Sequence, residues 1–227
     1  MGRLDVVPHI AVVDPAVHSP ELCSFNWMSS RSDLALTYHL PALFGFKSFP
    51  KDMKALKGVI VLGSASSVND DLDWQRSLKD WLFKVIEHEI PVLGICFGHQ
   101  LIAHMYGANI AYLFPDQRKL TGFRRVKLAF DDFKIKKELE LFSSHNQHVT
   151  DIPKGFVVAG QTPDVAIEAL KHKKKPIFTV QTHPEASETF IESRKTPEQQ
   201  HLGSLADGRM FIDRFLEFVS KIHVSQG

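Results

Sequence analysis

The sequence has few cysteines, almost no net charge and no long apolar run. Only two cysteines, Cys23 and Cys96, stand among its 227 residues. This excludes a disulfide-rich secreted scaffold and favours a reducing, cytoplasmic setting with Cys96 free. We expect Cys23 to be a small buried or half-buried residue. The formal net charge of +1 gives no broad attraction to nucleic acid or to an anionic membrane. No apolar stretch approaches the roughly 20 residues of a membrane-spanning helix.

Several common ligand-binding patterns are also missing. The chain has no Gly-x-x-x-x-Gly-Lys-Ser/Thr run to hold nucleotide phosphates and no paired Cys-x-x-Cys to hold zinc. Residues 1–5 lack the apolar centre of a signal peptide. We therefore expect no cofactor, no metal, no nucleic acid and no membrane among the binding partners.

Apolar runs and helical patterns alternate through the first half of the chain. The predicted strands are 9–13, 58–62 and 91–95, and the predicted helices are 71–89 and 97–106. Segment 19–49 is mixed and is expected to hold a helix and a long connection. Strands that alternate with helices in this way predict a parallel sheet with helices on both faces.

The second half changes character. Three predicted strands, 126–130, 156–159 and 165–170, follow one another without long helices between them, which indicates an antiparallel extension. A further strand is predicted over 177–180 and a final helix over 209–219. The expected fold class is a flavodoxin-like, doubly wound, mostly parallel α/β sheet with a small antiparallel extension. No linker interrupts the pattern, so residues 1–227 are predicted to form one domain.

Cys96 lies in a pattern typical of a nucleophile elbow. An apolar strand runs into Gly94-Ile95-Cys96-Phe97-Gly98, and a helical pattern follows. The flanking glycines leave room for a tight turn in which the cysteine adopts a strained backbone conformation. The amides at the start of the following helix would favour the thiolate form.

His183 and Glu185 are the strongest partners for this thiol. His183 follows the predicted strand 177–180, and Glu185 stands two residues further on. The carboxyl ends of parallel strands meet at one edge of the sheet, so Cys96 and His183 can both reach that edge. Glu185 could then hold the imidazole in its working tautomer.

Four segments together resemble the class I glutamine amidotransferases. The two main ones are Gly94-Ile95-Cys96-Phe97-Gly98-His99-Gln100 and Gln181-Thr182-His183-Pro184-Glu185. The loops 62–68 and 143–149 resemble the family's oxyanion loop and its glutamine-holding loop, and all four segments occur in family order. The segment around 37–41 resembles more narrowly the stand-alone relatives of the glutaminase domain of GMP synthase.

The resemblance implies a role for each matching residue. Cys96 would attack the side-chain amide of glutamine, His183 would move the proton, and Glu185 would orient His183. The backbone amides of Phe97 and Ser64 would hold the oxyanion of the γ-glutamyl intermediate. The implied substrate contacts are Gln100, Gly63, Ser144, His145, Asn146 and Gln147.

The oxyanion loop departs from the family pattern. The family usually has Gly-Gly-Pro, whereas this chain has Gly63-Ser64-Ala65. A serine makes a left-handed backbone conformation costlier than a second glycine would. Asn146 replaces a common glycine in the other loop, but asparagine tolerates that conformation better than most residues.

Three functions stay open at this point. The chain could hydrolyse L-glutamine and supply ammonia to a partner synthetase. It could instead be a stand-alone γ-glutamyl peptidase or hydrolase, because these share the acyl half and differ only in the leaving amine. It could also be a non-catalytic binding or regulatory protein, although the intact Cys96, His183 and Glu185 argue against this.

Overall fold

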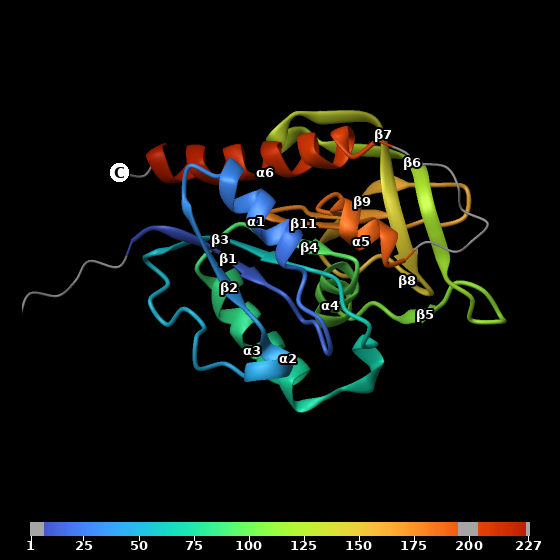
Figure 1. The fold of residues 1–227 in the computed structure, drawn as a ribbon, viewed down its shortest axis with the longest axis horizontal. Coiled ribbons are helices and arrows are strands. Elements are labelled where there is room, and N and C mark those ends of the chain that lie inside the picture. The colour runs from blue at the N-terminus through green and yellow to red at the C-terminus, as the bar shows by residue number, and fades with distance from the viewer. Residues whose placement is uncertain (1–6, 195–203, 226–227) are drawn as a thin grey trace, which may run out of the picture.

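A nine-stranded mixed sheet forms the centre of the protein (Figure 1). The computed structural model describes residues 7–194 and 204–225. In spatial order the strands are β2 (Ala35–His39), β1 (His9–Val13), β3 (Leu56–Val61), β4 (Val92–Ile95), β11 (Ile177–Val180), β10 (Ala169–His172), β9 (Phe156–Gln161), β6 (Leu120–Phe130) and β7 (Ile135–His145). The first five pair in parallel and the last four continue the sheet in antiparallel fashion.

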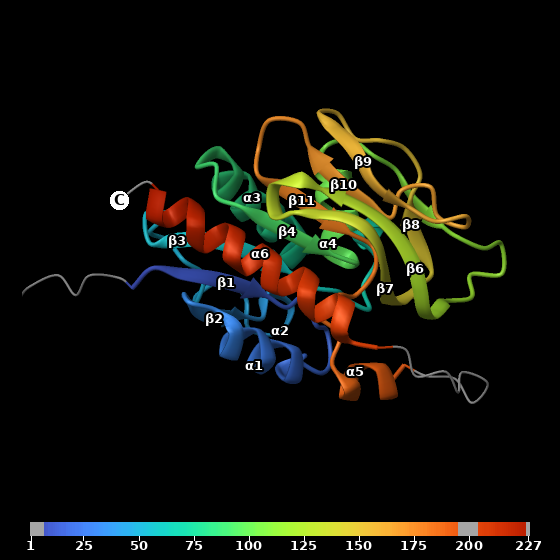
Figure 2. The ribbon, with the colours of Figure 1, turned by 90° about the horizontal axis from the view of Figure 1, so that it is seen from above.

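Helices cover both faces of the parallel part. On one face lie α1 (Leu22–Arg31) and α6 (Ala206–Ser225), and on the other lie α3 (Asp73–Glu87) and α4 (Phe97–Met105) (Figures 1 and 2). The smaller elements are α2 (Pro41–Phe44), α5 (Glu188–Glu192), the 3₁₀ turns Val68–Asp70 and Asp131–Phe133, and a ribbon of β5 (Ile110–Tyr112) with β8 (Gln147–Val149). Within the described ranges, no helix has both the length and the apolar character needed to cross a membrane.

The alternation of side chains along the strands builds a separate apolar core on each face. In β1, Ile10 and Val12 join the core under α1 and α6, whereas Ala11 and Val13 join the core under α3 and α4. This is the period of two that a pleated strand imposes. All five residues of β1 are buried, as expected for a strand covered on both faces.

The predicted fold class is confirmed, including the antiparallel extension. Segment 19–49 was wrongly expected to contain no strand, because β2 lies within it. That strand is at the sheet edge and only His39 is fully buried, so it lacks the apolar run of an inner strand.

Other strand predictions need smaller corrections. Strand β10 begins only at Ala169, so residues 165–168 form a buried loop rather than a strand. Strand β7 was missed because its lysines and glutamates at 136–140 obscure the alternation with buried Ile135 and Leu139. Residues 1–5, considered above for a leader sequence, lie outside the described residues.

Candidate active site

Cys96 occupies the turn between β4 and α4. Its backbone has φ 51° and ψ −100°, a conformation that is rare for any residue with a side chain. Its amide donates a hydrogen bond to the carbonyl of Val180 at 2.9 Å, which fixes the turn to neighbouring β11. The first amides of α4 follow directly, and these have no acceptor within their own helix. The turn thus presents a thiol beside backbone donors.

The two glycines of the elbow serve close packing. Neither Gly94 nor Gly98 has a positive φ, so the strained residue of the turn is Cys96 itself. A Cβ atom at Gly98 would lie 2.4 Å from the carbonyl oxygen of Val61, and one at Gly94 would lie 2.6 Å from the carbonyl oxygen of Gly98. The missing side chains therefore let α4 start directly against β3 and β4.

His183 and Glu185 form a buried pair next to this turn. The Nδ1 atom of His183 lies 2.8 Å from Oε1 of Glu185, and the side chains are 4% and 3% exposed. The amide of His183 donates to the carbonyl of Phe142 at 2.7 Å, which ties the segment after β11 to β7. The Nε2 atom of His183 is buried without a hydrogen-bond partner among the described residues.

The charge state of His183 follows from these neighbours. Burial would lower the pKa of the imidazole, but the negative charges of Cys96 and Glu185 outweigh burial and raise the pKa to about 10. His183 therefore carries a proton at neutral pH in the free enzyme. A histidine held in this state can stabilise a neighbouring thiolate and later give its proton to a leaving amine.

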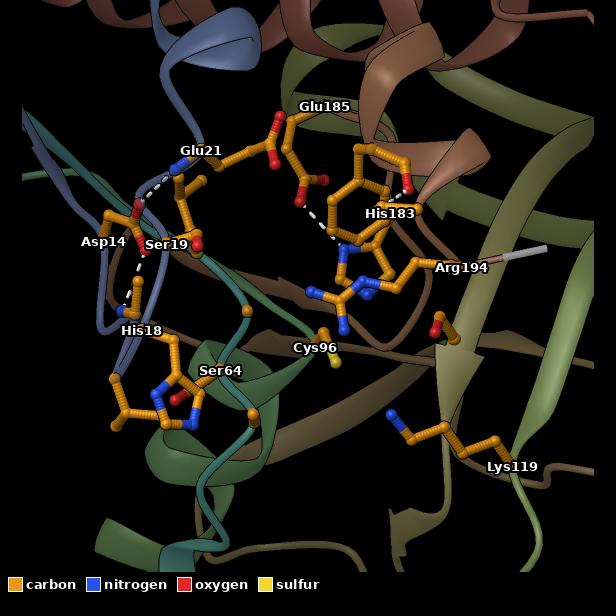
Figure 3. A pocket seen from close by; sticks show the side chains of 18 residues that line it. Asp14, His18, Ser19, Glu21, Ser64, Cys96, Lys119, His183, Glu185 and Arg194 are labelled. Atoms are coloured by element: carbon orange, nitrogen blue, oxygen red, sulfur yellow. Dashed lines mark hydrogen bonds and ion pairs between the residues drawn. The ribbon is translucent and has the colours of Figure 1, made fainter.

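A cavity of about 340 Å³ opens in front of Cys96 (Figure 3). Six of the residues singled out from the sequence contribute to its lining, namely Cys96, His183, Glu185, Gly63, Ser64 and Ser144. Its other charged residues are Asp14, Glu21, Lys119 and Arg194. The volume falls in the ~300–1,000 Å³ range of small-molecule sites.

The loop after β3 packs tightly against the histidine. A Cβ atom at Gly63 would lie 2.8 Å from Cε1 of His183. The hydroxyl of Ser64 donates to the carbonyl of Pro15 at 2.7 Å and accepts the amide of Ser66 at 3.1 Å. Ser64 does not have a positive φ, so its side chain holds a loop conformation that a serine adopts without strain.

The remaining predicted substrate contacts do not line this cavity. Gln100 is buried, and its amide nitrogen donates to the carbonyl of Gln147 at 2.8 Å and to Oε1 of Gln181 at 3.1 Å. His145 is also buried, with Nδ1 2.9 Å from the carbonyl of Gln147, and burial lowers its pKa to about 4. Asn146 is half-buried. These residues connect α4 to the loop between β7 and β8.

Phe97 is the first residue of α4, and its side chain is buried against Trp74. Its backbone follows Cys96 directly, at the place expected for an oxyanion donor. His99 points into the core, where Nδ1 lies 2.7 Å from the hydroxyl of Thr179 and burial lowers the pKa to about 3. This neutral, buried ring agrees with the structural role expected for His99.

Sequence reasoning missed the carboxylates that line the cavity. Asp14 directly follows β1 and accepts hydrogen bonds from the amides of Ala16 and Glu21 and from the hydroxyl of Tyr38. Burial raises the pKa of Asp14 and of Glu21. The strand-end rule that located Cys96 and His183 could have found Asp14 as well.

Cys23 was wrongly expected to be buried or half-buried: it is exposed on α1. Its position on the outer side of that helix explains this, because the helix buries Ser24 and Met28 instead. Among the described residues, no group of histidines, cysteines and carboxylates is arranged to hold a metal ion.

Comparison with known proteins identifies this arrangement. The family model for class-I glutamine amidotransferases matches residues 39–197. The chain belongs to the class I glutamine amidotransferase family. The predicted resemblance is thereby confirmed, and membership implies an enzyme with glutamine amidotransferase activity.

The curated relatives of this amidotransferase include separate subunits and longer chains. It is 34% identical over 137 residues to the glutamine-hydrolyzing GMP synthase subunit of Methanocaldococcus jannaschii, covering 60% of this chain and 68% of the relative. It is 34% identical over 140 residues to the corresponding subunit of Methanococcus aeolicus, covering 61% and 70%. The 35% identical match to GMP synthase of Acetivibrio thermocellus covers 59% of this chain but only 25% of that protein.

Solved structures of amidotransferases share the fold. A glutamine amidotransferase from Thermotoga maritima superposes with a TM-score of 0.71 at 14% identity, covering 94% of this chain and 98% of the other. A glutamine amidotransferase from Methylobacillus flagellatus gives a TM-score of 0.70 at 19% identity, covering 96% and 95%. At these identities the likeness shows the fold alone.

Proposed function

We propose that this amidotransferase hydrolyses the side-chain amide of L-glutamine through a γ-glutamyl thioester on Cys96. The observation that carries the proposal is the meeting of a strained cysteine and a buried His183–Glu185 pair at the wall of one cavity. The three residues come from the ends of β4 and β11, which pair in parallel. This is the nucleophile, base and orienting group that covalent amide hydrolysis requires.

The first half of the reaction breaks the amide. The Cys96 thiolate attacks the δ-carbon of glutamine and forms a tetrahedral oxyanion. His183 gives its proton to the leaving nitrogen, the carbon–nitrogen bond breaks, and ammonia leaves. Glu185 keeps the imidazole oriented through Nδ1 and balances its charge. In the second half, water attacks the thioester with His183 as base, and glutamate is released.

Backbone amides around the turn are the proposed oxyanion donors. The amide of Phe97 starts α4, and the amides of Gly63 and Ser64 donate to no backbone carbonyl of the described residues. The Ser64 hydroxyl, bonded to Pro15, would hold this loop in place. One such donor is typically worth about 10²–10³ in rate.

The loop that contains Ser144 is the proposed binding place for the α-amino and α-carboxylate groups of the substrate. Ser144 lines the cavity. Gln100 supports this loop through the carbonyl of Gln147, so its contribution to binding would come through loop position. His145 and Asn146 would act in the same way, through the main chain of the loop.

A partner synthetase is the proposed acceptor of the ammonia. The relatives from Methanocaldococcus jannaschii and Methanococcus aeolicus are named as glutamine-hydrolyzing subunits of GMP synthase. The longer GMP synthase of Acetivibrio thermocellus matches this chain over a quarter of its length. We propose that residues 1–227 form a single glutaminase domain that works with a separate synthetase chain.

Turnover of glutamine by the purified protein tests this proposal. We expect glutamate and ammonia to form in equal amounts, faster when an ammonia-dependent synthetase from the same organism is added. Cys96→Ala should abolish turnover, whereas Cys23→Ala, which removes the exposed cysteine, should retain it. Turnover that persists in Cys96→Ala would place the nucleophile elsewhere.

A further inference from the structure

Two cationic side chains line the cavity from different elements. Lys119 stands just before β6, and Arg194 stands two residues after α5 (Figure 3). Neither forms an ion pair with a carboxylate among the described residues, although most other arginines whose contacts are described do. Figure 3 shows both side chains extending toward Cys96. Unpaired cations beside a reactive centre indicate that the cavity receives carboxylate groups.

Arg194 lies on the side of the histidine. Its guanidinium carbon is 5.1 Å from the centre of the Phe190 ring, and the Phe190 ring is 4.8 Å from the His183 ring. Phe190 therefore separates the guanidinium from the imidazole and keeps the two cations from direct contact. Because His183 gives its proton to the leaving nitrogen, this is the side of the leaving group.

Lys119 lies on the opposite side, next to the loop proposed to hold the glutamyl group. Its neighbour Leu120 pairs with His145 in the register of β6 and β7, and Thr121 pairs with Ser144. The ammonium group thus enters the cavity near Ser144. A carboxylate at this position would be the α-carboxylate of the glutamyl group, which every γ-glutamyl substrate has.

The cavity is larger than glutamine hydrolysis needs on the leaving side. A departing ammonia needs about the ~30 Å³ of one water molecule, whereas the whole cavity measures about 340 Å³. The carboxylates that share the wall are already engaged. Asp14 accepts three hydrogen bonds, and Glu21 accepts the hydroxyls of Ser24 and Ser187. They leave Arg194 free for a ligand.

We infer that the enzyme also cleaves γ-glutamyl amino acids, with Arg194 binding the carboxylate of the leaving amino acid and Lys119 the α-carboxylate of the glutamyl group. The inference rests on the proposed Cys96 thioester. Cys96 attacks the γ-carbonyl, the bond to the amino acid nitrogen breaks, and His183 protonates that nitrogen. The free amino acid departs, and water converts the thioester to glutamate.

Three substrates separate these roles: γ-glutamylglycine, γ-glutamylethylamide and glutamine. The first has a carboxylate on its leaving group, and the other two do not. Arg194→Gln should lower kcat/KM for γ-glutamylglycine about 10- to 100-fold more than it lowers kcat/KM for the other two, as expected for the loss of a charge-assisted hydrogen bond. Lys119→Gln should lower kcat/KM for all three by a similar factor. Arg118→Gln, whose guanidinium pairs with Asp116 outside the cavity, is the control.

Two results would overturn the inference while leaving the proposed function intact. One is a wild-type enzyme that turns over glutamine but not γ-glutamylglycine. The other is an Arg194→Gln variant that loses activity on all three substrates equally, which would place Arg194 on the glutamyl group. A wild-type enzyme that turns over none of the three would instead contradict the proposed function itself.

Discussion

The Nδ1 atom of His183 lies 2.8 Å from Oε1 of Glu185, and both side chains are almost fully buried. Because the bond uses Nδ1, Nε2 is the ring nitrogen left for the chemistry, and it has no other partner among the described residues. The carboxylate thus fixes both the orientation and the charge of the imidazole.

Replacing Glu185 by glutamine should therefore impair chemistry more than binding. The variant can keep a hydrogen bond to the ring, but it removes the charge that supports the imidazolium. We expect kcat for glutamine to fall about 10²–10⁴-fold with a smaller change in KM. Steady-state kinetics check this, with Glu188→Gln on exposed α5 as control. A Glu185→Gln enzyme with normal kcat would show that orientation alone suffices.

Gly63→Ala should disturb the histidine without unfolding the chain. The added Cβ would lie 2.8 Å from Cε1 of His183, so the ring must move. A displacement of this size can cost about 10²-fold in rate. We expect kcat to fall by about that factor while the thermal midpoint changes little. Ala65→Ser, in the same loop, is the control, and equal losses in the two variants would argue against a specific clash.

Gly98→Ala should act on stability instead. A Cβ atom there would lie 2.4 Å from the backbone oxygen of Val61, which cannot move without shifting β3. Overpacking of this kind typically costs about 1–3 kcal/mol. Urea denaturation should show that loss in the free energy of unfolding. The contrary result would be a variant as stable as the wild type, which would mean that α4 can move away from the sheet.

The raised pKa of His183 predicts how stability depends on pH. The folded protein keeps this proton up to about pH 10, whereas an unfolded histidine releases it near pH 6.5. Between these values the folded state binds more protons, so the free energy of unfolding decreases as pH rises. The stabilisation is fully present below about pH 6.5 and is lost as pH passes about 10.

Urea denaturation of the wild type and of His183→Gln across this range measures the effect. The wild type should lose more stability between pH 7 and pH 10 than the variant does, because only the wild type releases this proton. Parallel pH profiles for the two proteins would show that His183 does not carry the charge assigned to it.

The fold and the catalytic residues could be predicted from sequence for a common physical reason. Inner strands such as β4 and β11 are buried on both faces and leave an unbroken apolar signal. The residues that follow them, Cys96 and His183, must then meet at one edge. Edge strand β2 gives no such signal, since most of it is partly exposed, and so its Tyr38 was missed.

The rest of the cavity depends on contacts between distant loops. Arg194 and Lys119 stand outside regular elements, so no periodicity marks them. The bond from Ser64 to Pro15 joins loops 49 residues apart in the chain. Such contacts become visible only once the strands have brought the loops together.

Labelling with an electrophilic glutamine analogue tests the central claim most directly. Cys23 is exposed and Cys96 is buried, so a simple accessibility effect would favour Cys23. Peptide mass spectrometry should find one analogue per chain, on Cys96, and excess glutamine should slow the labelling. Labelling of Cys23 in preference to Cys96, or labelling that glutamine does not slow, would contradict the assignment of Cys96 as the nucleophile of a glutamine site.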